Sequence, residues 1–314
     1  MNQTGATTRL RLDTAVPFVS ILTVVGIASL ASNVISIVLI FKTTTLRNSY
    51  NIFILHSAVA DLAITVTSVP FWVLTAIYNE GKSINDLSCK VNACLTFIDI
   101  VGSLLFLTLV TAQRHSNLVD PKHCRKIFTV ARRHLMIIVV WFITILLSLP
   151  PNLAWQVATE KKCFPDFTTN VWYTSFVIIV FYLFPSLASI TASIYDIMYF
   201  RPGCEPNSGS LFKNCRKTTM KPEEMEAQKA VFILVLIQTI CWLPFVIVSL
   251  TQAGSRMTNV SLNFIALAIG FSSTALKGLS YCVQHPEIWE LLRGKGRTSE
   301  NLENCENLEL RQKT

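Results

Sequence analysis

Long segments without a charged residue dominate this chain and restrict it to few folds. No charged residue lies between Asp13 and Lys42. About 20 apolar residues are enough for a helix to cross the hydrocarbon core of a bilayer, so this segment is long enough to span a membrane. Similar segments, three of them with a single charge inside, follow at residues 50–77, 91–112, 135–156, 168–195, 230–252 and 258–282. The sequence therefore predicts seven membrane-spanning segments.

These segments are expected to be helices, because backbone N–H and C=O groups in lipid must be hydrogen-bonded within the chain. With 51% hydrophobic and only 15% charged residues, the chain has the composition of a polytopic membrane protein. We predict an all-α fold, a bundle of seven transmembrane helices at residues 14–293 that ends in a short amphipathic helix at 286–293. An N-terminal segment at 1–13 precedes the bundle and a tail at 294–314 follows it.

The basic residues predict the orientation of the bundle. Most of the 27 lysines and arginines follow the first, third, fifth and seventh predicted spans. Cytoplasmic loops of membrane proteins are enriched in these residues, so we expect an extracellular N-terminus and a cytoplasmic tail at the cell membrane. The net charge of +8 is then a consequence of topology and of contact with membrane lipid, and no nucleic-acid partner is expected.

Three charged residues, Asp61, Asp99 and Lys277, lie within the predicted spans. A carboxylate in mid-membrane costs about 2.5–3.5 kcal/mol on insertion scales, so it should face the bundle interior and have a partner. Asp99 lies four residues before Ser103, which places both on one face of a helix. The alternatives are a polar residue that only packs between helices, and the relay of an ion-coupled transporter. No internal repeat of the kind found in transporters is present.

A series of spaced residues resembles the landmarks of the rhodopsin-like (class A) G-protein-coupled receptors. In chain order they are Asn33, Leu46-Arg47-Asn48, Ala60-Asp61-Leu62, Cys89, Arg114, Pro121, Trp141, Pro151, Cys163, Pro185, Cys241-Trp242-Leu243-Pro244 and Tyr281. Within this family, residues 46–53, 100–103 and 149–153 look most like the melatonin-receptor branch and its invertebrate orphan relatives. The resemblance implies a receptor that passes an extracellular signal to heterotrimeric G proteins, without enzymatic activity or a cofactor.

The resemblance assigns the coupling switch to Arg114, Glu224 and Tyr281. Gln113 stands in place of the acid that usually precedes the arginine, and His115 in place of the tyrosine that usually follows it. An ion pair between Arg114 and Glu224 is the expected restraint, and the alternative is an arginine that extends to lipid headgroups.

The resemblance also implies a polar site in mid-membrane, where an asparagine of the seventh span and the aspartate of the second often hold a sodium ion. Lys277 takes the place of that asparagine, so its ammonium is expected to reach Asp61 and replace the sodium ion. The predicted intramembrane polar cluster comprises Asn33, Asp61, Asp99, Ser103 and Lys277. A retinal Schiff base on Lys277 is the alternative, but Phe271 occupies the position of the opsin lysine.

The predicted ligand pocket is largely apolar and is lined by Thr96, Trp72, Trp242, Phe245 and Gln252. Thr96 stands where amine receptors have an aspartate, so nothing there would offset a buried ammonium. We expect a small neutral or lipid-like ligand, with a peptide as the alternative. A silent or decoy receptor is the second interpretation of the whole chain.

The cysteines show no CxxC pair, so no metal site is predicted. Cys89 and Cys163 fall on the expected extracellular side, where disulfides form, whereas Cys124, Cys204, Cys215 and Cys305 fall on the reducing side. We therefore pair Cys89 with Cys163. Asn2 begins the sequon Asn2-Gln3-Thr4 and is a predicted glycosylation site.

Overall fold

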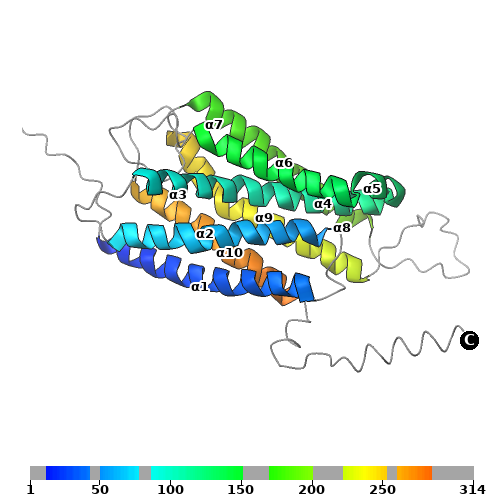
Figure 1. Ribbon diagram of the computed structural model, residues 1–314, viewed down its shortest axis with the longest axis horizontal. Helices are drawn as coiled ribbons and strands as arrows, with labels where there is room; N and C mark the ends of the chain where they lie inside the picture. The colour runs from blue at the N-terminus through cyan, green and yellow to red at the C-terminus, as the bar shows by residue number, and fades with distance from the viewer. Residues whose placement is uncertain are drawn as a thin grey trace, which may run out of the picture.

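The computed structural model describes residues 12–42, 50–77, 86–150, 170–200, 222–252 and 260–284. Helices make up nearly all of these residues, and the described part contains no strand. The long helices run side by side along the longest axis of the molecule (Figure 1). The expected amphipathic helix at 286–293 lies outside the described residues.

Seven spans of the described part are long and apolar enough to cross a membrane. Five of them are single helices: α1 (Leu12–Lys42), α2 (Asn51–Ile77), α6 (Val130–Leu149), α9 (Pro222–Gln252) and α10 (Val260–Gln284). The third span joins α3 (Asp86–Ile98), η2 (Asp99–Ser103) and α4 (Leu104–Val119), and the fifth joins α7 (Val171–Val177), η4 (Ile178–Leu183) and α8 (Phe184–Tyr199). The predicted seven-helix bundle is therefore confirmed.

The η segments are single π-helical turns inside otherwise α-helical spans. The turn η4 ends at Leu183, two residues before Pro185, which lies in the first turn of α8. Proline has no N–H and its ring collides with the carbonyl of the preceding turn, so the helix has to widen there. The turn η2 consists entirely of buried residues and includes both Asp99 and Ser103.

A short helix, α5 (Pro121–Ile127), follows the third span at the end of the bundle where Arg114 lies. Asp120 caps it, because its Oδ1 accepts hydrogen bonds from the backbone N–H groups of Lys122 and His123 at 3.0 and 3.1 Å. These bonds favour the carboxylate form and lower the pKa of Asp120. Pro121 at the first position supplies a preformed helical φ.

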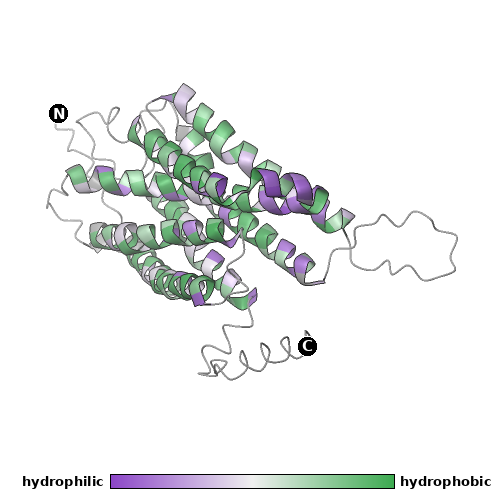
Figure 2. Ribbon diagram, turned by 45° about the vertical axis from the view of Figure 1, so that its right-hand side comes forward, coloured by the Kyte–Doolittle hydropathy of each residue, from purple (hydrophilic) through white to green (hydrophobic). Residues whose placement is uncertain are grey.

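The fourth span starts five residues earlier than the predicted segment at 135–156. Thr129 caps it, accepting a hydrogen bond from the N–H of Arg132 at 3.4 Å, so Arg132 and Arg133 belong to the first turn of α6. Hydrophobic residues cover most of the length of the spans, and hydrophilic residues gather at their ends near α5 (Figure 2). The apolar run alone therefore marked the membrane-embedded part of this helix and missed its polar start.

Candidate functional site

A buried ion pair lies at the centre of the bundle and joins α10 to α2. Lys277 Nζ is 2.8 Å from Asp61 Oδ1, and the two side chains are only 4% and 2% exposed. The ammonium also donates to Ser103 Oγ at 3.0 Å, and Ser103 Oγ donates to Asp61 Oδ1 at 3.0 Å. Ser57 of α2 hydrogen-bonds to Ser103 at 3.1 Å. Lysine, aspartate and serine therefore form a closed triangle between three spans.

Asp99 and Asn33, the other members of the predicted cluster, have different surroundings. Asp99 is 1% exposed and close enough to Asp61 and Lys277 to interact with both electrostatically. Neither of its carboxylate oxygens has a hydrogen-bond partner among the described residues. Asn33 instead donates to the carbonyls of Ser29 and Thr274, both at 3.0 Å. It ties α1 to α10 beside the ion pair and makes no hydrogen bond to it.

A cavity of about 20 Å³ lies next to the ion pair, lined by Asn33, Asp61, Lys277 and Tyr281 among others. That volume is about enough for one water molecule. Tyr281 is buried and packs in the hydrophobic cluster around Phe106 and Val110. The structure thus places the tyrosine of the predicted switch one turn from Lys277, on the same wall of this cavity.

Arg114 lies at one end of the bundle and is held by neutral groups. Its Nε donates to Gln228 Oε1 at 2.7 Å, and its Nη2 donates to the backbone carbonyl of Glu224 at 3.0 Å. The guanidinium also lies over the ring of Tyr50, 4.7 Å from its centroid. Arg114 therefore does meet Glu224, but through the main chain. Gln228, one turn further along α9, occupies the place beside the guanidinium where the acid was expected.

Gln228 continues this contact to a carboxylate on another span. Its Nε2 donates to Asp196 Oδ2 at 2.9 Å, and the other oxygen of Asp196 lies 2.7 Å from His115 Nδ1. Asp196 belongs to α8 and is completely buried, whereas His115 is 36% exposed. These four side chains, Arg114, Gln228, Asp196 and His115, form one connected chain, which we call the Arg114 relay.

A cavity of about 440 Å³ opens beside Arg114. Its lining mixes apolar residues, Leu118, Phe128 and Ala227, with the more polar Tyr50, Gln113, Arg114, Asn117, Cys124, Arg125 and Glu224. Cys124 Sγ donates to the carbonyl of Gln113 at 3.5 Å, and burial raises the pKa of this thiol. The cavity therefore lies between the ends of α4 and α9 and the short helix α5.

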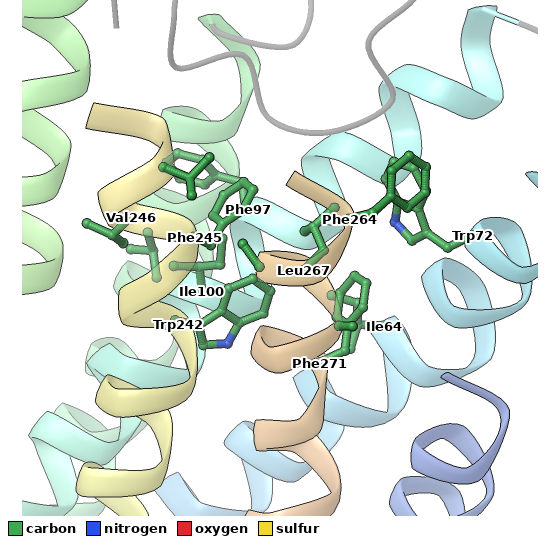
Figure 3. Packing of buried hydrophobic residues seen from close by; sticks show 14 of the residues in the cluster. Ile64, Trp72, Phe97, Ile100, Trp242, Phe245, Val246, Phe264, Leu267 and Phe271 are labelled. Carbon is green, nitrogen blue, oxygen red and sulfur yellow. The ribbon is translucent and has the colours of Figure 1, made fainter. Parts of the chain in front are cut away.

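Three residues of the predicted ligand pocket, Trp72, Trp242 and Phe245, pack into a buried aromatic cluster in the half of the bundle opposite Arg114. Trp242 makes edge contacts with Phe245 and Phe271, with centroids 5.9 and 5.7 Å apart (Figure 3). A Cβ at Gly270 would lie 2.6 Å from the Trp242 ring, so only glycine leaves room for this indole. Trp72 packs on Phe264 at 5.2 Å in the same cluster.

Of the remaining predicted site residues, Thr96 is fully described by the structure and four others are not. Thr96 is fully buried, and its hydroxyl donates to the carbonyl of Asn92 at 2.9 Å. The side chains of Gln252 and Cys89, and all of Cys163 and Asn2, lie outside the described residues.

The sequence profile described as "7 transmembrane receptor (rhodopsin family)" matches residues 32–276, which is more than half of the chain. The chain belongs to the rhodopsin family of seven-transmembrane receptors. This receptor is 25% identical over 255 residues to the melatonin receptor type 1A of Mus musculus, covering 79% of this chain and 69% of that one. It is 23% identical over 290 residues to the GQ-coupled rhodopsin of Mizuhopecten yessoensis, covering 86% and 57%.

A QRFP-like peptide receptor of Branchiostoma floridae is 22% identical over 278 residues, covering 83% of this receptor and 72% of that one. The matches confirm a class A receptor near the melatonin-receptor branch. Because these relatives are receptors, the chain is a multi-pass membrane receptor and not an enzyme.

Two residues of the Arg114 relay, Asp196 and Gln228, did not emerge from the sequence. Asp196 carried one signal, because it is an acidic residue directly after the apolar segment at 168–195. A charge at that depth calls for a buried partner. Gln228 carried none, since a glutamine near the start of a span has no pattern of its own.

Proposed function

We propose that this receptor transduces an extracellular ligand signal to a heterotrimeric G protein through the Arg114 end of the bundle. The observation that carries the proposal is the 440 Å³ cavity around Arg114. It lies between α4, α5 and α9, where a separation of α9 from α4 would enlarge it. The family of the chain and the name of its relative, the GQ-coupled rhodopsin, support a G protein as the partner.

In this proposal the Arg114 end faces the cytoplasm. Arg125 and Lys126 in the last turn of α5, and Arg132 and Arg133 at the start of α6, lie at this end, in accord with the positive-inside rule. Residues 1–13 then form an extracellular segment, 14–293 the transmembrane domain with its interfacial helix, and 294–314 a cytoplasmic tail.

For the ligand we propose a small neutral or lipid-like molecule that binds above Trp242, in contact with Thr96, Trp72, Phe245 and Gln252. The cluster around Trp242 is apolar, with few polar groups to orient a ligand. The names of the melatonin receptors among the relatives favour a small molecule, and the name of the QRFP-like receptor keeps a peptide as the alternative.

The buried ion pair bears on two other interpretations. Lys277 Nζ donates to both Asp61 and Ser103, and the cavity beside it measures only about 20 Å³, which disfavours a retinal Schiff base. An ion-coupled transporter would need this pair to exchange its proton or ion. A silent or decoy receptor would keep the fold and lose coupling.

The test is ligand-independent nucleotide exchange on a panel of G proteins in cell membranes. Wild type is compared with Lys277→Asn, with Arg114→Ala as the variant that should lose exchange, and with Lys229→Ala as an exposed control. Exchange above that of empty membranes, lost in Arg114→Ala and altered in Lys277→Asn, is expected. If the wild type conducts protons or sodium ions and no variant promotes nucleotide exchange on any G protein of the panel, the receptor proposal is wrong and a transporter takes its place.

A further inference from the structure

The Arg114 relay contains a polar amide whose orientation is determined by its neighbours. A guanidinium only donates hydrogen bonds, and a carboxylate only accepts them. Gln228 therefore has to direct Oε1 to Arg114 and Nε2 to Asp196, as the 2.7 and 2.9 Å distances show. A single amide thus links a positive charge on α4 to a negative charge on α8 from a position on α9.

The buried carboxylate of Asp196 needs the hydrogen bonds of this arrangement. It is completely buried, and a buried carboxylate is costly unless hydrogen bonds and opposite charge compensate it. Its two oxygens are occupied by Gln228 Nε2 and His115 Nδ1. The Arg114 guanidinium acts on the same carboxylate electrostatically, across the amide. Removing the Gln228 side chain would take one hydrogen bond from Asp196 and one from Arg114, and the two charges would lose the amide that links them.

The relay also replaces a contact that this chain lacks. The residue before Arg114 is the neutral Gln113, and Glu224 offers Arg114 its backbone carbonyl. Among the described residues, Asp196 is the carboxylate to which the side-chain hydrogen bonds of Arg114 lead. Three spans, α4, α8 and α9, therefore meet at one buried charge.

We propose that Asp196 is the acid that restrains Arg114 in the resting receptor, and that Gln228 is the positioning residue through which it acts. Separation of α9 from α4 and α8 breaks both hydrogen bonds of Gln228 and leaves Asp196 with His115 alone. The relay therefore favours the closed arrangement seen in the structure. This inference rests on the proposed signalling function, so its test needs one readout that does not involve a G protein.

Three variants test the relay. Gln228→Leu disconnects Arg114 from Asp196 with a side chain of similar size, and Asp196→Asn removes the charge while keeping the shape. The double variant Asp196→Asn/Gln228→Glu moves the carboxylate onto α9, where it accepts from both Arg114 and the new amide of residue 196. The matched control is Thr239→Val, which removes a different side-chain hydrogen bond between α9 and α8, to Ser186 at 3.3 Å.

Two measurements are made on each variant. The first is ligand-independent nucleotide exchange, normalised to receptor at the cell surface. The second is the distance between spin labels at Val119→Cys of α4 and Glu226→Cys of α9, both exposed, in a background without other accessible cysteines. We expect the two single variants to lengthen this distance and to raise exchange by about tenfold, because hydrogen bonds to charged groups are among the stronger ones. The double variant and Thr239→Val should behave as wild type.

The outcomes separate the relay from the function. Single variants that lengthen the distance while no variant, wild type included, exchanges nucleotide would support the relay and overturn the proposed coupling. Unchanged distance and unchanged exchange in both Gln228→Leu and Asp196→Asn would overturn the relay. A double variant that stays as open as the single variants would show that the position of the charge does not matter, which also contradicts the proposal.

Discussion

Lys277 and Asp61 show how a charge is accommodated in the middle of this bundle. Moving two ions out of water carries a desolvation penalty that their attraction offsets only when the remaining hydrogen bonds are also made. Here Ser103 bonds to both partners and Ser57 bonds to Ser103. The network is therefore satisfied around the lysine, and the residue that is left over is Asp99, whose carboxylate oxygens have no hydrogen-bond partner in the described part.

The Lys277→Ala variant should unfold at a markedly lower temperature than wild type, because it leaves Asp61 buried without its cation. Breaking one partner of a buried pair costs about 3–5 kcal/mol. Asp61→Asn/Lys277→Gln, which removes both charges, should recover most of the loss. The measurement is the midpoint of thermal unfolding of the purified receptor in detergent. Lys229→Ala is the control, since its pair with Glu226 is exposed and exposed pairs contribute about 0–1 kcal/mol. A double variant no more stable than Lys277→Ala would contradict this account.

We further expect the stability of the wild type to be insensitive to sodium. Lys277 Nζ contacts Asp61 Oδ1 and Ser103 Oγ, so the fixed ammonium occupies the oxygens that a sodium ion would need. Midpoints of thermal unfolding in sodium chloride and in choline chloride at equal ionic strength should therefore agree. The Lys277→Asn variant, which empties the site, should gain a stabilisation by sodium. A clear sodium-dependent rise for the wild type would refute the replacement.

The helix α10 can approach α1 closely because of one glycine. A Cβ at Gly278 would overlap Ser32 Oγ and lie 2.9 Å from Ser32 Cβ and 3.2 Å from the backbone N of Asn33. The same contact region includes the hydrogen bond from Asn33 Nδ2 to the carbonyl of Thr274 at 3.0 Å. Small residues at a helix interface let two backbones come close together in a membrane. This approach also sets the depth at which Lys277 reaches Asp61.

Gly278→Ala should destabilise the receptor, because backbone as well as a side chain of α1 has to move. Overpacking of this kind costs about 1–3 kcal/mol. Gly102→Ala is the matched control, since its Cβ would find its nearest neighbour, Thr144, at an ordinary 3.5 Å, and alanine is the better helix former. Of the two alanine variants, only Gly278→Ala should lower the midpoint of thermal unfolding. Adding Ser32→Gly to Gly278→Ala should restore part of the lost stability, because it removes the side chain that the new Cβ overlaps. Equal midpoints for the two alanine variants would argue against close packing at Gly278.

The orientation of the whole receptor in the membrane rests on charge. Seven spans place the two termini on opposite sides of the bilayer, and the basic residues of α5 and the start of α6 lie at the Arg114 end. In the proposed orientation these residues face the cytoplasm, as the positive-inside rule expects. The proposed G-protein cavity then opens on the side where G proteins are found.

An epitope tag before Met1 should be stained on intact cells, and a tag after Thr314 only after permeabilisation. Asn2→Gln should also increase the electrophoretic mobility of the receptor, if the sequon at Asn2 is on the extracellular side and carries a glycan. Staining of the C-terminal tag on intact cells would invert the topology and exclude the cavity at Arg114 as a G-protein site. Staining of a cytosolic marker protein, which should appear only after permeabilisation, serves as the control for membrane integrity.

The sequence by itself determined the number of spans, their approximate bounds, the family and the charges in mid-membrane. These depend on local properties, because the length of an apolar run and the cost of a buried charge can be read along one dimension. The contact of Lys277 with Asp61 was also predicted, from the family resemblance, because Lys277 takes the place of an asparagine that lies near this aspartate in related receptors.

Only the tertiary structure decided how the helices are rotated and shifted against one another, which depends on close packing such as that of Gly278 on Ser32. Glu224 and Gln228 lie on the same face of α9, so a shift of one turn along the helix axis decides which side chain meets Arg114, and no sequence pattern indicates that shift. The contact of Asn33 with Thr274 and the link from Gln228 to Asp196 follow from the same packing. Apart from Lys277 and Asp61, which the family resemblance brought together, the polar partners on different spans could be identified only from the geometry of the bundle.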